Sequence, residues 1–116
     1  MTQFSITYVD GIGVLKFPPR VDSTNSLDLE EKINEILSTK KSILCDLSEN
    51  TYVSSFPMRI FLQTTKHMKD IGGKFAMCSI SPMVQEVFDI SGFSTILALY
   101  SSESEAISEL KTNTPQ

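Results

Sequence analysis

Two adjacent serines, Ser54 and Ser55, stand where a short apolar segment ends and a helical pattern begins. One hydroxyl at such a junction can accept a hydrogen bond from a free backbone N–H of the first helical turn, which contributes about 1 kcal/mol. An exposed hydroxyl there can also be phosphorylated, because the positive end of the helix dipole tolerates the added negative charge. A single serine is enough for capping, and spacing alone favours capping over modification.

Other residue types that carry chemistry are few. His67 is the only histidine and falls on the polar side of its predicted helix, and without a Cys-x-x-Cys pair we expect no metal site. Cys45 and Cys78 lie in apolar, strand-like segments, so we expect buried, reduced thiols. A Cys78–His67 nucleophile pair is disfavoured, because an apolar strand lacks the electropositive setting that activates a thiol. We expect neither an enzyme nor a bound cofactor.

The charge and the hydrophobic pattern of the chain argue against some classes of binding partner. The chain has 116 residues and a net charge of -4, with ten Lys and Arg scattered among fourteen acids. Nucleic-acid binding needs clustered cations, so it is not expected. The first residues have neither the basic nor the apolar region of a signal peptide, and no apolar run approaches the roughly 20 residues of a membrane helix. We expect a cytoplasmic protein without membrane contact.

The positions of the candidate residues depend on the elements around them. Period-two alternation and helical spacing predict strands at residues 4–9, 14–17, 42–47, 75–78 and 95–100, and helices at 29–37, 58–71, 82–91 and 102–111. The order β-β-α-β-α-β-α-β-α implies parallel crossovers on a mixed sheet, so the fold class is α/β. We expect a single domain over residues 1–111 and a frayed tail at 112–116.

Periodicity also predicts which side chains face the core. In the second helix the expected buried stripe is Met58, Phe61, Leu62, Thr65, Met68 and Ile71. In the third helix it is Val84, Val87 and Phe88. Ser81 and Pro82 are expected to begin that helix as its cap and first residue, and Gly72 to end the preceding one with a positive φ.

Several segments resemble a known family. Residues 78–93 (CSISPMVQEVFDISGF) resemble the second half of STAS domains of the bacterial anti-sigma factor antagonist type. Residues 20–22 (RVD) are similar to the family's Gly-x-Leu-Asp segment, and residues 46–48 (DLS) to its Asp-Leu-Ser. The resemblance extends over essentially the whole chain. It implies a STAS-type mixed sheet with helices, in agreement with the order of elements above.

The resemblance also implies a mechanism, which is partner switching. An unmodified antagonist of this family binds an anti-sigma factor that is also a serine kinase, and phosphorylation of one serine breaks the complex until a serine phosphatase restores it. The family motif is Asp-Ser-Ser/Thr-Gly, and its phosphorylated serine corresponds to Ser55, with Ser54 as the alternative. Ser54, Phe56 and Pro57 replace the other three motif residues. Pro57 removes an N–H and disfavours helical angles at Phe56.

From the same resemblance we expect a docking face. The residues implied are Asp22, Ser23, Ser54, Ser55, Met58 and Arg59. The chain is expected to be a monomer or a weak dimer. Because the motif is degenerate, a second reading is a STAS module that is not phosphorylated and acts as a constitutive binding or scaffold domain. A third reading is an enzyme that uses the Cys78 thiol.

Overall fold

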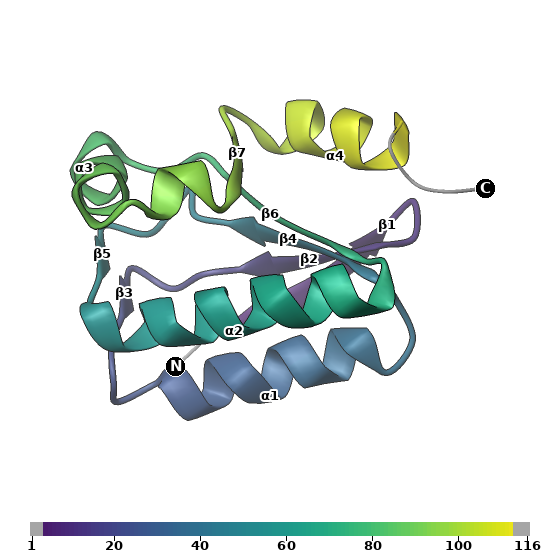
Figure 1. The fold of residues 1–116 in the computed structure, drawn as a ribbon, viewed down its shortest axis with the longest axis horizontal. Helices are drawn as coiled ribbons and strands as arrows, with labels where there is room; N and C mark the ends of the chain where they lie inside the picture. Colours follow the sequence, from purple (N-terminus) through teal and green to yellow (C-terminus); the bar gives the residue numbers. More distant parts are fainter. Residues whose placement is uncertain (1–3, 113–116) are drawn as a thin grey trace.

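A computed structural model describes residues 4–112 of the chain (Figure 1). Its elements are β1 (Ser5–Val9), β2 (Ile12–Lys16), β3 (Arg20–Val21), α1 (Ser26–Leu37), β4 (Ser42–Asp46), β5 (Tyr52–Val53), α2 (Ser55–Ile71), β6 (Lys74–Cys78), α3 (Pro82–Ser91), the 3-10 turn η1 (Phe93–Thr95), β7 (Ala98–Tyr100) and α4 (Glu103–Thr112). The main sheet has the order β1-β2-β4-β6-β7, with β1 antiparallel and the other pairs parallel. The predicted α/β class and mixed sheet are confirmed.

Local chemistry explains the start and end of several elements. Asp10 and Gly11 have φ of 52° and 82°, the left-handed pair that a tight hairpin between β1 and β2 requires. Gly72 ends α2 at φ 71°, as expected. The Ser81 hydroxyl accepts a hydrogen bond from the Val84 N–H at 3.3 Å, so the predicted cap of α3 is confirmed.

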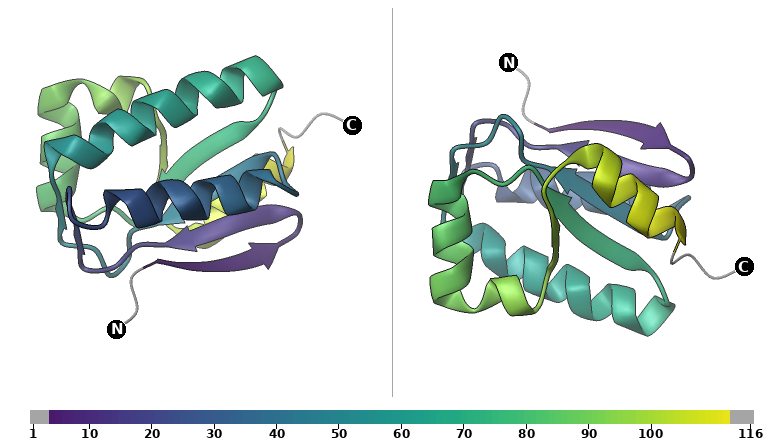
Figure 2. Two further views of the ribbon diagram at one scale, coloured as in Figure 1. Left: turned by 90° about the horizontal axis from the view of Figure 1, so that it is seen from below. Right: turned by 90° about the horizontal axis from the view of Figure 1, so that it is seen from above.

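Helices cover both faces of the sheet. Figure 2 shows α1 and α2 over one face and α4 over the other. Every residue of β4 is buried, because the strand lies between these two layers. Phe61 of α2 is at the centre of the larger layer, with its ring 6.0 Å from that of Phe17 and 6.2 Å from that of Phe88. The α4 layer is smaller and rests on Ala106 and Leu110.

The structure corrects two predicted helix faces. Ile60 and Thr64 of α2 are buried, whereas Leu62 and Thr65 are only half-buried. In α3, Val87 is 40% exposed instead of buried. The reason is the place of α3 at one end of the sheet, beside β5 (Figure 1), where only a narrow strip of the helix contacts the core.

Strand boundaries also differ from expectation. The predicted strand at residues 95–100 is reduced to β7, because Gly92 at φ 83° leads into η1, and the Leu97 N–H bonds back to the Phe93 carbonyl at 2.9 Å. The two short strands β3 and β5 were not predicted, and they pair in a small parallel sheet of their own. The predicted tail at 112–116 lies, except for Thr112 at the end of α4, outside the described residues.

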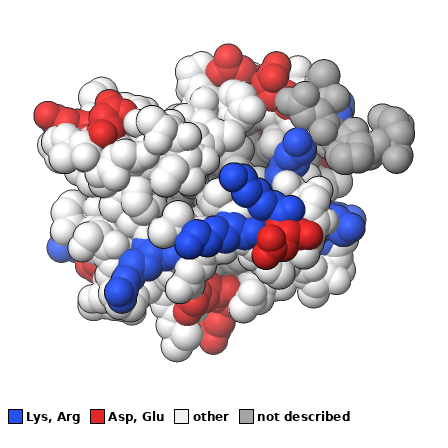
Figure 3. Space-filling view, in the orientation of Figure 1, with Lys and Arg blue, Asp and Glu red and all other residues white. Residues whose placement is uncertain are grey.

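Charged side chains separate by element. Figure 3 shows Lys and Arg in a row along α2, with Asp and Glu gathered mainly below it on α1 and above it on α3 and α4. Within residues 4–112, no helix combines the length and the apolar character needed to cross a bilayer.

Candidate partner-binding site

The small sheet of β3 and β5 brings two loops together. Val21 is paired with Val53, and the Ser54 N–H donates to the Val21 carbonyl at 3.0 Å. Asp22 follows β3 and Ser54 follows β5, so these two residues continue the same parallel register. The loop that starts α1 therefore lies beside the start of α2 (Figure 1).

A buried amide links the two halves of this small sheet. Asn50 is 2% exposed, and its Nδ2 donates to the Pro18 carbonyl at 2.9 Å and to the Tyr52 carbonyl at 3.1 Å. The Thr51 N–H donates to the Pro19 carbonyl at 2.8 Å. Asn50 thus ties the segment before β3 to β5. Sequence reasoning missed this role, because the contacts join residues about thirty positions apart.

The Asp22 carboxylate organises the first loop. It accepts hydrogen bonds from the Thr24 N–H at 2.9 Å, from the Thr24 hydroxyl and from Arg20 Nε at 2.8 Å. These bonds, the Thr24 hydroxyl first, hold the pKa of Asp22 below its ordinary value. The carboxylate therefore stays ionised at neutral and mildly acidic pH. Ser23, at the tip of the same loop, is exposed.

The two serines differ in accessibility, and neither caps the helix. Ser54 is the residue before α2, is half-buried and makes no capping hydrogen bond with its side chain. Ser55 is the first helical residue and is exposed. Pro57 occupies the third position, whose N–H a capping oxygen commonly uses, and proline has none. Phe56 is helical in spite of Pro57, which corrects the expected departure of Phe56 from helical angles, because proline fits the first turn.

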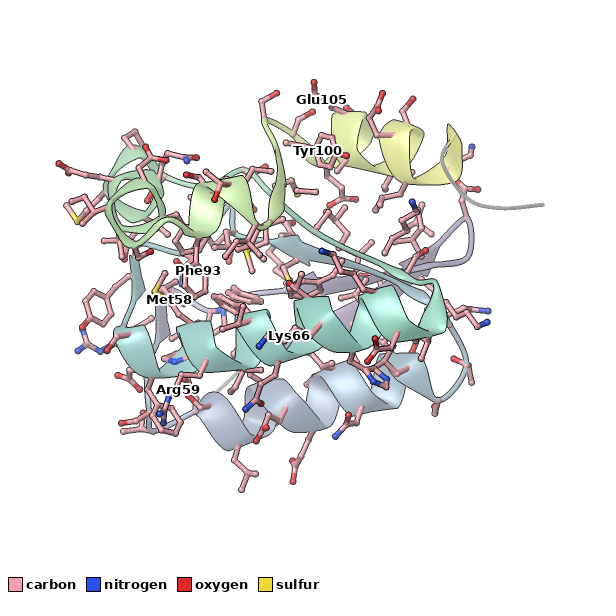
Figure 4. The ribbon with its side chains drawn as sticks, in the orientation of Figure 1. Met58, Arg59, Lys66, Phe93, Tyr100 and Glu105 are labelled. Atoms are coloured by element: carbon pink, nitrogen blue, oxygen red, sulfur yellow. The ribbon has the colours of Figure 1, made fainter. Side chains whose placement is uncertain are left out.

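One member of the expected docking face lies beneath the surface. Met58 is only 5% exposed and packs into the core, so it supports this surface from beneath. Arg59 is exposed and points away from the core (Figure 4). Two exposed aromatic residues that were not expected on the docking face lie near the serines: Phe56 is 48% exposed and Tyr52 41%. The Arg20 guanidinium carbon lies 4.3 Å from the centre of the Tyr52 ring, a cation–π contact.

The two cysteines and the histidine do not form a reactive site. Cys45 and Cys78 are free and buried, as predicted. Burial raises the pKa of Cys45 well above its ordinary value and raises that of Cys78 to about 11, with the Asp46 carboxylate adding to both shifts. Both thiols are therefore protonated at neutral pH, which argues against a thiol nucleophile. His67 is exposed, and among the described residues no group of three potential ligands could hold a metal ion.

Comparison with known proteins identifies the family. The STAS domain family profile matches residues 3–106, so the chain belongs to the STAS domain family. The resemblance inferred from the sequence is thereby confirmed.

Individual relatives cover almost the whole chain. A Bordetella bronchiseptica protein with the provisional name anti-sigma factor antagonist BtrV is 29% identical over 109 residues, which are 93% of this chain and 94% of the relative. An anti-sigma factor antagonist from Mycobacterium paratuberculosis superimposes with a TM-score of 0.84 at 18% identity, covering 94% and 93% of the two chains. SpoIIAA in its unphosphorylated form gives 0.81 at 18% identity, covering 97% and 99%. The two structural likenesses establish the fold.

Proposed function

We propose that this protein is an anti-sigma factor antagonist that acts in the cytoplasm and binds an anti-sigma factor through the surface formed by the α2 start and the Asp22 loop. The names of its relatives support the pathway, since both BtrV and an anti-sigma F factor antagonist from Paenibacillus polymyxa match nearly the full chain. The chemistry of the surface supports a protein partner, because exposed aromatic and arginine side chains typically dominate the energy of protein interfaces.

We further propose that Ser55 is the residue through which binding is controlled. The observation that carries this is its exposed hydroxyl at the first position of α2, with no capping bond at the adjacent Ser54. Bacillus SpoIIAA, which has the same fold, occurs in unphosphorylated and phosphorylated forms. A phosphate adds about -1.5 to -2 charge at neutral pH. It would stand four residues before Arg59, within reach of its guanidinium, and would withdraw that cation from a partner.

A second candidate function is a binding module that is not phosphorylated. It is favoured by one specific observation, the presence of Ser54, Phe56 and Pro57 where the family motif has Asp, Ser or Thr, and Gly. A kinase that recognises those motif residues finds a bulky aromatic ring and a proline beside the hydroxyl. Modification of the purified protein distinguishes the two functions.

The first experiment locates the phosphate. Each anti-sigma factor kinase encoded by the source organism is purified and incubated with the protein and Mg-ATP, and the product is analysed by intact mass and fragmentation. We expect one phosphate on Ser55, none in Ser55→Ala, and normal modification of Ser54→Ala. A phosphate on Ser54 would move the switch by one residue, and no phosphate with any kinase would support the unmodified binding module.

The second experiment measures the consequence for binding. We expect Ser55→Asp to weaken the complex with the cognate anti-sigma factor by about tenfold or more, and Ser55→Ala to bind like the wild type. Ser104→Asp, which adds the same charge on the exposed surface of α4, is the matched control and should bind normally. Equal affinity of Ser55→Asp and the control would remove Ser55 from the interface.

A further inference from the structure

The cations of this protein divide into two sets. Four have a carboxylate partner within the chain: Lys16 with Glu49, Arg20 with Asp22, Lys32 with Asp28, and Lys111 with Asp10. The other six have no ion pair among the described residues, and they are Lys40, Lys41, Arg59, Lys66, Lys69 and Lys74. We refer to these six as the cationic belt.

The belt runs along α2 and continues beyond the end of this helix in two adjoining segments. Arg59, Lys66 and Lys69 are all exposed on α2, and the first two are seven residues apart, which is two helical turns. The end of α2 then meets the segment between α1 and β4, because the Lys74 N–H donates to the Lys41 carbonyl at 2.9 Å. Figure 3 shows the part of the belt on α2 as a row of blue side chains.

Local helix stability explains only a part of this arrangement. A cation in the last turn of a helix interacts favourably with the helix dipole, which accounts for Lys69. Arg59 stands in the second turn, where the dipole is unfavourable or negligible for a cation. Lys40, Lys41 and Lys74 lie outside α2. On α2 itself three unpaired cations stand with one acid, Asp70, although the net charge of the chain is -4, and helix stability does not explain this excess.

We propose that the cationic belt is a docking surface for an acidic face of the same anti-sigma factor that binds at Ser55. This proposal rests on the proposed function and extends the interface from the start of α2 along its exposed face, over about 25 Å for seventeen residues. The belt mainly increases the rate of association with the partner, because complementary charges steer the encounter of two proteins. It adds little to the affinity, because exposed ion pairs are weak.

The surroundings of the belt favour a protein over other polyanions. The belt begins beside the exposed aromatic ring of Phe56, so that charged residues border an apolar anchor, as at the rim of a protein interface. Acidic residues on α1, α3 and α4 would repel the phosphates of a duplex or a bilayer that approaches the α2 side broadly. A narrow acidic strip on a protein can contact α2 while meeting fewer of these acids than a duplex or a bilayer would.

The belt also gives the phosphate on Ser55 a wider effect. Its first cation, Arg59, is four residues from Ser55 on the same helix. A phosphate on Ser55 makes the electrostatic potential at this end of the belt negative. It therefore slows the association of the acidic partner and also weakens the contacts within the complex.

The test compares two charge deletions of equal size. K66Q/K69Q removes two unpaired cations from the belt, and K16Q/K111Q removes two cations that lie outside it. Association of each variant with the purified anti-sigma factor is followed by stopped flow at about 0.02 to 0.15 M salt. We expect K66Q/K69Q to associate about tenfold more slowly than the wild type at low salt, with a shallower salt dependence, and K16Q/K111Q to differ less than twofold. Equal rates for the two variants would overturn the proposal.

A second measurement needs no natural partner. Poly-L-glutamate is titrated into the wild-type protein, and the amide signals are followed by NMR, with poly-L-lysine, phosphatidylglycerol vesicles and duplex DNA as comparisons. We expect poly-L-glutamate to shift signals at residues 40–41 and 59–74 selectively. Shifts caused only by vesicles or DNA would assign the belt to a membrane or a nucleic acid instead. If no anti-sigma factor binds the wild type, the proposed function fails, and this titration shows separately whether the belt recognises acidic protein.

Discussion

Pro57 determines what the neighbouring hydroxyls can do. It occupies the third position of α2, and its missing N–H removes one of the two donors that a capping oxygen could use. The side chain of Ser54 makes no cap bond, and the hydroxyl of Ser55 remains exposed. In α3, by contrast, Pro82 is the first residue and Ser81 caps the Val84 N–H. A difference of two positions in the placement of proline separates Ser81, which caps its helix, from Ser54, which does not.

This contrast predicts the cost of removing each hydroxyl. Ser81→Ala should lower the free energy of unfolding by about 1 kcal/mol, because a cap is lost. Ser54→Ala should lower it by less than about 0.5 kcal/mol, because no cap exists there and surface changes are usually small. Urea unfolding followed by far-UV circular dichroism measures both values. A loss for Ser54→Ala equal to that of Ser81→Ala would mean that Ser54 caps α2 in solution.

At the scale of elements, two very short strands position the whole candidate site. Neither β3 nor β5 has more than two residues, and so small a sheet is not stable by itself. It persists because Val21 and Val53 are buried in the core and because Asn50 bonds both to a carbonyl group before β3 and to one in β5. The start of α2 is thereby held next to the Asp22 loop.

Asn50→Asp should loosen this arrangement. The replacement keeps the shape but exchanges an NH2 donor for an acidic oxygen that faces the Pro18 and Tyr52 carbonyl groups. We expect a loss of about 2 to 4 kcal/mol in the free energy of unfolding. Asn34→Asp, at an exposed position of α1, is the control and should change stability by less than about 0.5 kcal/mol. Equal stability of the two variants would contradict a positioning role for Asn50.

At the scale of the whole molecule, β4 joins two layers of unequal size. The larger layer contains α1, α2 and most of the aromatic residues, and the smaller one is covered by α4 (Figure 2). Cys45 and Leu44 are neighbours in β4 and face different layers. Because one strand serves both layers, disruption of either layer exposes the same backbone, and we expect the two to unfold together as a single domain.

Core substitutions in the two layers test this expectation. Phe61→Ala in the larger layer should cost about 3 to 5 kcal/mol, and Leu110→Ala in the α4 layer about 2 to 5 kcal/mol. Both variants should unfold in one transition that is the same by circular dichroism and by tyrosine fluorescence. A separate, earlier transition in Leu110→Ala would show that the α4 layer unfolds by itself and that the single-domain prediction is wrong.

The order of elements could be predicted from the sequence because its signals are local. Alternating residues 4–9, the turn at Asp10 and Gly11, the Ser81-Pro82 start and the Gly72 end each depend on neighbours in the chain. The family resemblance likewise depends on short segments. The same local information placed the paired serines at the start of α2.

Long-range contacts decided which side chains are buried and how the site is assembled. An amphipathic pattern indicates which face of a helix can be covered, but it does not indicate how much of that face is covered. Thr64 is buried and Val87 exposed according to what lies opposite each helix, and no periodicity reports that. The bonds of Asn50 and the pairing of β3 with β5 join residues about thirty positions apart. The cations are scattered along the sequence, and they form a belt only when the end of α2 meets the segment before β4. Their sequence spacing does not predict this, because Lys41 and Lys74 come together only in the folded chain.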